Sequence, residues 1–169
     1  MFKKKICLLG EFGVGKTSLI RQYVLHAYSD KYISTVGVVI NKKTVLLPNG
    51  IEVMLLIWDM EGQEDFSAYS KTYLRGLSGY ILVADGTRPE TLATASATKD
   101  AMTDIFPAVP SVLLLNKHDL QSDWKIKKDD CSDFSDSGIR ILNTSAKTGA
   151  GVDSAFMYIA EKMAGTEND

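Results

Sequence analysis

The stretch G-E-F-G-V-G-K-T, which runs from Gly10 to Thr17, decides the fold class of this chain. An apolar run, residues 6–9, precedes it, and a helical pattern over residues 18–23 follows. A strand, a glycine-rich turn and a helix in this order form the context in which such a turn binds phosphate. The alternative, a chance match in a glycine-containing turn, is disfavoured by that context. The stretch predicts a nucleoside triphosphate site and leaves the base and the reaction open.

The physical basis of this prediction is anion binding by the backbone. Successive N–H groups around Gly13, Gly15 and Lys16 point into one concavity, where the helix dipole favours negative charge. Glycine lets the backbone approach phosphate without a Cβ clash. The Lys16 ammonium is expected at the β and γ phosphates, and the Thr17 hydroxyl is expected to bind Mg²⁺.

A second motif concerns the base. The apolar run 112–115 ends in N-K-H-D, residues 116–119, at the carboxyl end of a predicted strand, where α/β sheets bind ligands. The Asp119 carboxylate can accept from both N1–H and the amine of guanine, whereas adenine would leave it unpaired. The alternative for N-K-H-D is a helix cap after a strand. A further strand near residues 139–142 precedes T-S-A-K, residues 144–147, whose backbone N–H groups can meet the guanine carbonyl oxygen.

With these motifs the sequence resembles a small GTPase of the Ras superfamily and is most similar to the Rab branch. The resemblance covers essentially the whole chain and includes W-D-M-E-G-Q-E, residues 58–64, and Y-I-S-T-V-G, residues 32–37. It implies an α/β P-loop NTPase fold, with a six-stranded, mostly parallel sheet, one antiparallel strand and about five flanking helices. It also implies that residues 1–169 form a single GTPase domain.

The resemblance assigns roles residue by residue. Thr17, Thr35 and Asp59 would hold Mg²⁺, and Gln63, which would orient the attacking water, would act in catalysis with Lys16 and Thr35. Ordinary alternatives are a strand-edge threonine for Thr35 and a polar loop residue for Gln63. GTP or GDP would contact a larger set: Gly13, Val14, Gly15, Lys16, Thr17, Ser18, Tyr28, Thr35, Gly62, Asn116, Lys117, Asp119, Ser145, Ala146 and Lys147.

Two functional hypotheses remain open at this point. The first is a Rab-like switch that binds GTP and GDP with Mg²⁺, hydrolyses GTP slowly and binds effectors in its GTP state. The second is a non-hydrolysing, GTP-dependent binding module. Gln63 favours the first, and Phe12 favours the second because the family has a small residue facing the γ-phosphate at that position. The resemblance also implies an exchange factor and an activating protein, and effector contact by Trp58, with Tyr73 and Ile40 undecided between effector surface and core.

Composition sets outer limits on these hypotheses. The chain has 169 residues, enough for one domain with a substantial core, and its formal net charge is −2, which disfavours nucleic acid as a partner. Two cysteines, Cys7 and Cys131, suggest neither a disulfide framework nor a metal site. No cysteine follows Cys131. We therefore expect a cytoplasmic protein with no intrinsic membrane anchor, attached to membranes only through partners or through a lipidated tail outside this sequence.

Hydrophobic patterns place the elements. Pro48-Asn49-Gly50 predicts a turn in an antiparallel hairpin, Thr87 to Glu90 predicts a capping box, and residues 121–137 resemble a solvated helix face. The lysines at 3–5 are interpreted as a solvated strand entrance. An apolar stripe predicts a last helix against the sheet: Val152, Ala155, Phe156, Ile159, Ala160 and Met163. Strands are predicted near residues 3–9, 37–47, 51–58, 79–85, 111–116 and 139–143.

Overall fold

A computed structural model describes residues 1–26, 28, 38–60 and 68–165 of the chain. These residues form a six-stranded sheet, five α-helices and two short 3-10 turns, with strands and helices alternating over most of the chain. The strands are β1 (Phe2–Leu9), β2 (Val39–Leu46), β3 (Glu52–Asp59), β4 (Gly79–Asp85), β5 (Ser111–Asn116) and β6 (Arg140–Asn143). The helices are α1 (Lys16–Leu25), α2 (Ala68–Tyr73), α3 (Glu90–Ile105), α4 (Ser132–Asp136) and α5 (Val152–Gly165), with 3-10 turns η1 (Gln121–Asp123) and η2 (Lys128–Cys131).

The strand order of the sheet is β2-β3-β1-β4-β5-β6, and β2 pairs antiparallel with β3 while every other neighbouring pair is parallel. The register places Leu8 beside Asp59 and Asp85 beside Asn116. The carboxyl ends of the parallel strands therefore meet at one edge of the sheet, which is where ligands bind in open α/β folds. The predicted fold class is confirmed.

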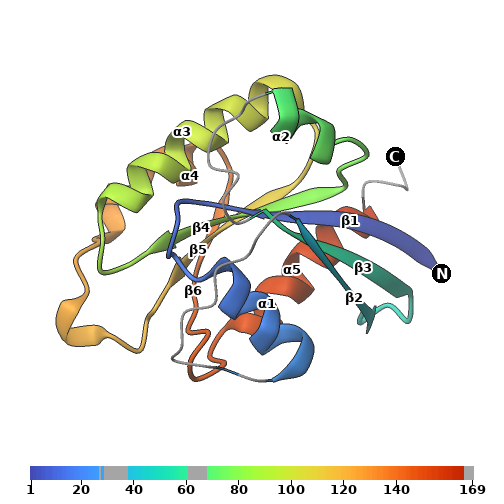
Figure 1. Ribbon diagram of the computed structural model, residues 1–169, viewed down its shortest axis with the longest axis horizontal. Helices are drawn as coiled ribbons and strands as arrows, with labels where there is room; N and C mark the ends of the chain where they lie inside the picture. The colour runs from blue at the N-terminus through green and yellow to red at the C-terminus, as the bar shows by residue number, and fades with distance from the viewer. Residues whose placement is uncertain (27, 29–37, 61–67, 166–169) are drawn as a thin grey trace.

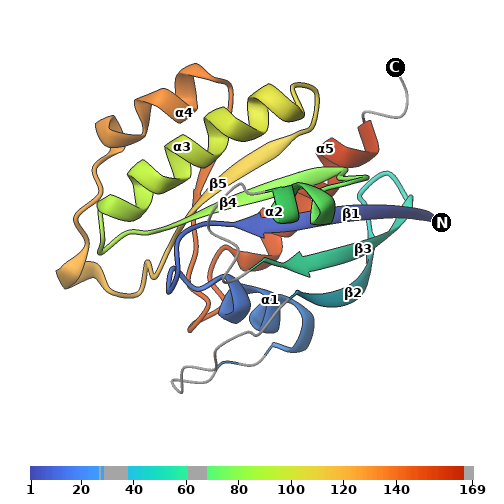
Figure 2. The same ribbon diagram turned by 45° about the horizontal axis from the view of Figure 1, so that its top comes forward.

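Helices cover both faces of the sheet (Figure 1). α1 and α5 lie on one face, and α3 and α4 lie on the other, as the turned view also shows (Figure 2). The side chains of β1 contribute to the apolar clusters on both faces of the sheet, because alternate side chains of a strand point to opposite faces. Ile6 and Leu8 belong to the apolar cluster with α1 and α5, whereas Cys7 and Leu9 belong to the cluster with α3.

The predicted hairpin and last helix are confirmed. β2 and β3 pair from Val39–Asp59 to Leu46–Glu52, and in the turn between them the Gly50 N–H donates to the Leu47 carbonyl, 2.9 Å away. Gly50 has a φ of 86°, a conformation that glycine adopts without a steric penalty. The six stripe residues of α5 are the buried residues of that helix.

Two local expectations are wrong. α3 begins at Glu90 with no side-chain cap, and Thr87 lies in the loop before it, where its hydroxyl donates to the Asp85 carboxylate, 2.7 Å away. Residues 121–137 do not form one solvated helix. They form two 3-10 turns and the short α4, and they bury three side chains in the cluster on the α3 face: Ile126, Cys131 and Phe134.

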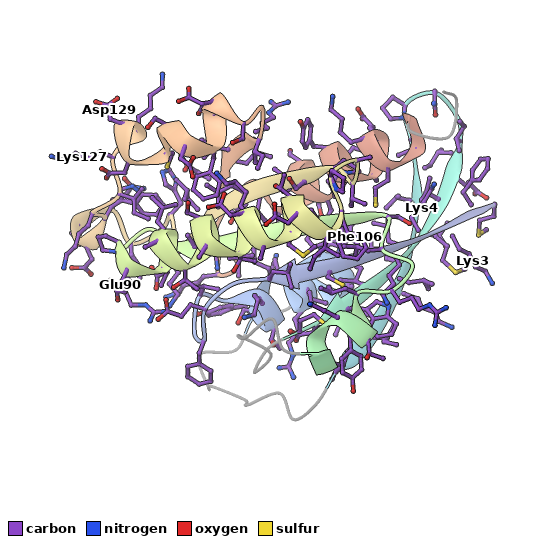
Figure 3. The ribbon with its side chains drawn as sticks, turned by 90° about the horizontal axis from the view of Figure 1, so that it is seen from above. Lys3, Lys4, Glu90, Phe106, Lys127 and Asp129 are labelled. Carbon is purple, nitrogen blue, oxygen red and sulfur yellow. The ribbon has the colours of Figure 1, made fainter. Side chains whose placement is uncertain are left out.

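The lysine run also differs from its interpretation. Lys3 is exposed, but Lys4 is buried, and the Lys5 ammonium donates to the carbonyls of Tyr73 and Arg75 and lies 3.8 Å from the centre of the Trp58 ring. Figure 3 shows Lys3 and Lys4 on the opposite side of the molecule from Glu90. Among the described helices, none is both long and apolar enough to cross a bilayer.

Candidate functional site

The predicted phosphate loop joins β1 to α1 and packs closely on the sheet. A Cβ on Gly10 would lie 2.4 Å from the Val83 carbonyl oxygen, so this approach requires glycine. Gly15 precedes α1 with a φ of 103°, and within the described residues no side chain caps the start of α1. The first N–H groups of a helix have no partner inside it. The loop and the helix start therefore offer backbone donors to an anion.

Lys16 is buried beside this loop, with 1% of its surface exposed. Its ammonium donates to the carbonyl of Gly10 and lies 3.4 Å from that of Glu11. Burying an ammonium is costly unless a counter-charge compensates it. Its place at the start of a helix therefore suits it to hold an anion against the loop.

Thr17 and Asp59 meet at the same edge. The Thr17 hydroxyl donates to Asp59 Oδ2 over 2.5 Å, although the two residues belong to different elements, α1 and β3. Asp59 ends β3 and is buried. A hydroxyl and a carboxylate next to a phosphate-binding turn are oxygen donors of the kind that Mg²⁺ prefers, so these two residues fit the predicted metal site.

The base motif lines a pocket of about 220 Å³ beside the phosphate loop, at the ends of β5 and β6. The structure brings residues of N-K-H-D and T-S-A-K together there, and it adds Leu120, which the sequence does not single out. The pocket residues are Gly15, Ser18, Tyr28, Asn116, Lys117, Asp119, Leu120, Ala146 and Lys147. The two motifs come together because β5 and β6 are parallel neighbours, so the loops that follow these strands leave the sheet at the same edge.

Asn116 joins this pocket to the phosphate loop. Its amide Nδ2 donates to the Val14 carbonyl over 2.9 Å, and its Oδ1 accepts from the Thr144 hydroxyl at 3.1 Å and the Ala146 N–H at 3.3 Å. A buried amide with both ends paired fixes the spacing between three loops. Thr144 is buried and helps to hold Asn116 in place, although the sequence motifs assign it no role.

Asp119 is held by the second loop of the pocket. The Ser145 hydroxyl donates to Asp119 Oδ1 over 2.7 Å, and the same hydroxyl accepts from the Thr148 N–H at 3.1 Å. A carboxylate offers about four acceptor positions, so this bond leaves room for the two donors of guanine. The orientation of the Asp119 carboxylate is therefore set by hydrogen bonds within the protein itself.

Asp85, at the end of β4, is the main residue that motif reasoning missed. It is 1% exposed, and its carboxylate receives the Thr87 N–H, the Thr87 hydroxyl and the ammonium of Lys117, which is 2.9 Å from Oδ2. Burial by itself would raise the pKa of Asp85, but these hydrogen bonds and the Lys117 charge hold the pKa below its ordinary value. One signal was present: an acidic residue ends a buried apolar strand, as Asn116 ends β5.

Several predicted residues stand apart from these contacts. Tyr28 lines the base pocket and is partly exposed. Phe12 is 48% exposed at the phosphate loop. Thr35, Gly62 and Gln63 lie outside the described residues, so their roles stay predictions.

A larger cavity, about 670 Å³, lies between β6 and residues 124–138. It contains none of the residues that the motifs predict, and its lining mixes apolar side chains with lysines and an arginine. A binding pocket needs convergent polar groups as well as volume, and the predicted base motifs converge on the smaller pocket. The smaller pocket beside the phosphate loop is therefore the better candidate.

Comparison with known proteins agrees with this geometry. Residues 5–165 match the sequence profile of the Ras family. The chain belongs to the Ras family. It is 35% identical over 161 residues to the Ras-related protein Rab-13 of the dog, Canis lupus familiaris, a match that spans 94% of this chain and 79% of the relative. The Rab-13 protein of cattle, Bos taurus, matches with the same identity and coverage.

The Ras-family chain is thus Rab-like, as the sequence motifs indicate, and it is a small GTPase with a guanine-nucleotide site in the general sense of its family. The fold agrees, since the sheet has one antiparallel edge strand and five described α-helices around it. The role of each residue remains a prediction to be tested.

Proposed function

We propose that this chain is a Rab-like switch that binds GTP and GDP with Mg²⁺, hydrolyses GTP and holds protein effectors in its GTP state. The observation that carries the proposal is the base pocket, where Asn116 and Asp119 are fixed by hydrogen bonds to the backbone and to Ser145. A pocket with a fixed carboxylate selects guanine over adenine, because adenine leaves that carboxylate unpaired. We take residues 1–169 as one GTPase domain.

In this proposal each end of the site has a distinct task. Asp119 accepts from the base, and the Ala146 N–H, near Asn116, lies at the loop expected to meet the guanine carbonyl oxygen. At the phosphate end Lys16 and the N–H groups of residues 13–18 bind the β and γ phosphates. Thr17, Asp59 and Thr35 would hold Mg²⁺, which neutralises charge that develops on the phosphates. Gln63 orients the attacking water, while Gly62 and Thr35 contact the γ-phosphate.

The partly exposed residues near β2 and β3 support a surface for protein partners. Ile40 is exposed, while Trp58 is half-buried with its ring 6.1 Å from that of Tyr73 and with the Lys5 ammonium over its face. Exposed apolar and aromatic side chains are typical of protein interfaces. We assign effector contact to Ile40 and Trp58 and a supporting position to Tyr73.

The test is to load the purified chain with GTP in the presence of Mg²⁺ and to identify the bound nucleotide over time. The proposal expects retention of guanine nucleotide over adenine nucleotide and conversion of bound GTP to GDP. Equal retention of ATP and GTP would contradict the guanine site. For Thr35→Ala, weaker effector binding with nearly unchanged GDP affinity is expected, and equal losses of GTP and GDP affinity would contradict the switch.

One observation favours the second candidate, a GTP-dependent binding module without hydrolysis. Phe12 places a large, partly exposed ring at the phosphate loop, where a small residue leaves room for the arginine of an activating protein. Retention of bound GTP without conversion, in the same experiment, would select this candidate. If the Phe12 ring obstructs the site only in part, an intermediate result is expected. GTP would then be converted to GDP slowly, and an activating protein would not accelerate the conversion.

A further inference from the structure

The loop between β4 and α3 carries an arginine that reaches the phosphate loop. The guanidinium of Arg88 donates from Nε to Asp85 Oδ2 over 3.1 Å and from Nη2 to the carbonyl of Phe12 over 3.0 Å. Phe12 belongs to the loop after β1, whereas Asp85 ends β4. One side chain therefore ties the phosphate loop to the neighbouring strand end.

The contact to Phe12 has a direct consequence for the next N–H group. No peptide bond among the described residues is cis. In a trans peptide the carbonyl of one residue and the N–H of the next point in opposite directions. When Arg88 holds the Phe12 carbonyl on its own side, the Gly13 N–H must point the other way. Arg88 thus fixes the direction of one of the donors that the sequence assigns to phosphate.

Asp85 connects Arg88 to the base end of the site. The same carboxylate oxygen that receives Arg88 Nε also receives the Lys117 ammonium, at 2.9 Å, while Thr87 occupies the other oxygen. Lys117 lines the base pocket. The buried Asp85 is therefore a shared anchor between a cation at the phosphate loop and a cation at the base pocket.

A second contact strengthens the link between α3 and the phosphate loop. The Thr94 hydroxyl, one turn into α3, donates to Glu11 Oε2 over 2.9 Å. Two consecutive loop residues, Glu11 and Phe12, are thus held by residues 88–94. A Cβ added to Gly13 would lie 3.4 Å from Arg88 Nη2, so the guanidinium is in van der Waals range of the loop. Figure 3 shows Glu90 at one end of α3 and Phe106 at the other, so the tie is made by the Glu90 end.

We propose that Arg88 is a positioning residue that couples the base pocket to the phosphate loop through Asp85 and thereby sets how long a guanine nucleotide stays bound. The inference rests on the proposed function, because it concerns the same site. Losing Arg88 removes the hydrogen bond that directs the Phe12 carbonyl, which weakens the alignment of the Gly13 N–H with phosphate and speeds nucleotide release. A hydrogen bond to a charged group corresponds to roughly a tenfold to hundredfold change in a rate of this kind.

The experiment measures release of a fluorescent GDP analogue from the full chain in excess unlabelled GDP and Mg²⁺. Arg88→Ala is expected to release it about ten to a hundred times faster than the unaltered chain. Arg88→Lys is expected to fall between the two, because one ammonium cannot reproduce the two-pronged geometry of the guanidinium. Arg140→Ala removes an exposed arginine on β6, outside this network, and is expected to leave the release rate unchanged.

Coupling is tested by combining Arg88→Ala with Lys117→Ala. If Asp85 joins the two cations, the double variant releases nucleotide more slowly than the product of the two single effects predicts. Strictly multiplicative effects would overturn the coupling. An Arg88→Ala rate within about twofold of the unaltered chain would overturn the positioning role, since the expected change is roughly tenfold or more.

The remaining outcomes are also decisive. If Arg88→Ala does not fold, as judged by circular dichroism, the Arg88→Lys rate replaces it, and a rate equal to that of the unaltered chain overturns the proposal. If the unaltered chain itself retains no guanine nucleotide, the proposed function fails. Failure of the inference alone leaves the unaltered chain with normal retention and the Arg88 variants indistinguishable from it.

Discussion

The two ends of the candidate nucleotide site are held in different ways. At the base end, Asn116 and Asp119 are oriented by hydrogen bonds that leave acceptor positions of the Asp119 carboxylate for a base. At the phosphate end, Lys16 Nζ, Thr17 Oγ1 and Asp59 Oδ2 bond to the loop or to each other through the atoms expected to bind phosphate and metal. A ligand meets atoms with spare acceptor positions at the first end, and at the second end it meets atoms that already bond to one another or to the loop.

This difference separates selectivity from rate. A pre-oriented group discriminates between ligands with little reorganisation, whereas charged groups and metal-binding oxygens act on the phosphates, where the reaction takes place. We therefore expect substitutions at the base end to change which nucleotide binds. Substitutions at the phosphate end should instead change how fast the nucleotide reacts or leaves.

The largest effect is expected for Asp119→Asn. The variant replaces two acceptors with one donor and one acceptor, which suits xanthine better than guanine. Two hydrogen bonds to a charged group amount to about 4 kcal/mol, so GTP affinity should fall on the order of a thousandfold while XTP affinity rises. Titration calorimetry with both nucleotides measures this.

Asp123→Asn is the matched control for that change, since Asp123 is exposed in the 3-10 turn that follows the base motif. It should leave both affinities unchanged. Unaltered GTP affinity in Asp119→Asn, with no gain for XTP, would show that the base is recognised elsewhere.

Gly15→Ala should disturb the point where the two ends join. The new Cβ would lie 2.3 Å from Asn116 Nδ2 at a φ of 103°, so both backbone strain and displacement of the buried amide are expected. Strain of about 1–2 kcal/mol and a displaced buried hydrogen bond of about 1–3 kcal/mol together predict a loss of about 3 kcal/mol in the free energy of unfolding. Urea denaturation measures the loss.

Gly50→Ala separates the two causes. Gly50 has a φ of 86° and no atom within 4 Å of an added Cβ, so this variant carries strain alone and should lose about 1–2 kcal/mol. Equal losses in the two variants would mean that the Asn116 contact contributes nothing.

Phe12→Gly tests the phosphate end of the site through the rate of GTP hydrolysis. A ring in the path of an activating arginine can displace that cation and the attacking water by about 1 Å, which costs on the order of a hundredfold in rate. Removing the ring should therefore accelerate single-turnover GTP hydrolysis, most of all with an activating protein present.

Phe2→Gly is the control, because Phe2 is exposed to nearly the same extent, 47% against 48%, at the opposite end of β1. Its hydrolysis rate should match that of the unaltered chain. Identical rates for Phe12→Gly and the unaltered chain, with and without the activating protein, would show that the ring turns away from the path.

The smallest effect concerns the pH dependence of stability through Asp85. Because the pKa of Asp85 is lowered in the folded state, its contribution is present above the unfolded pKa, about 3.9, and is lost as pH falls through the folded value. The difference in unfolding free energy between the unaltered chain and Asp85→Asn should therefore shrink on acidification below about pH 4.

Asp136→Asn is the comparison, since Asp136 is exposed at the end of α4. Its difference from the unaltered chain should stay small throughout. A stability difference for Asp85→Asn that is independent of pH would show that the charge of Asp85 does not stabilise the fold.

Sequence reasoning was most successful where one local pattern carried the whole signal. The apolar strands, the Pro48-Asn49-Gly50 turn and the stripe on α5 were predicted because burial and turn geometry depend on residues close in sequence. The prediction for Thr87 was wrong because α3 begins at Glu90, so Thr87 lies in the loop before the helix. There its N–H and its hydroxyl both donate to Asp85, a buried carboxylate that needs hydrogen-bond donors.

Residues 121–137 are a second segment for which the local sequence pattern gave a wrong prediction. Their charges predicted a solvated helix, but the Trp124 ring packs where a Cβ on Gly86 would lie, and the N–H groups of Lys125 and Ile126 donate to the Gly86 carbonyl. A helix cannot make those contacts with its own backbone donors, so the segment forms short turns instead. Nothing in the local pattern identifies Gly86 as the partner.

By itself the sequence determined the fold class and the family, and it predicted the residue types that would face phosphate and base, because each follows from short motifs and the period of apolar residues. The tertiary structure alone decided how the motifs are joined. Asn116 reaches Val14, Arg88 reaches Phe12, and Asp85 holds Lys117 only because β1, β4 and β5 lie side by side. Such contacts depend on the order of strands in the sheet, which brings together residues that are distant in sequence.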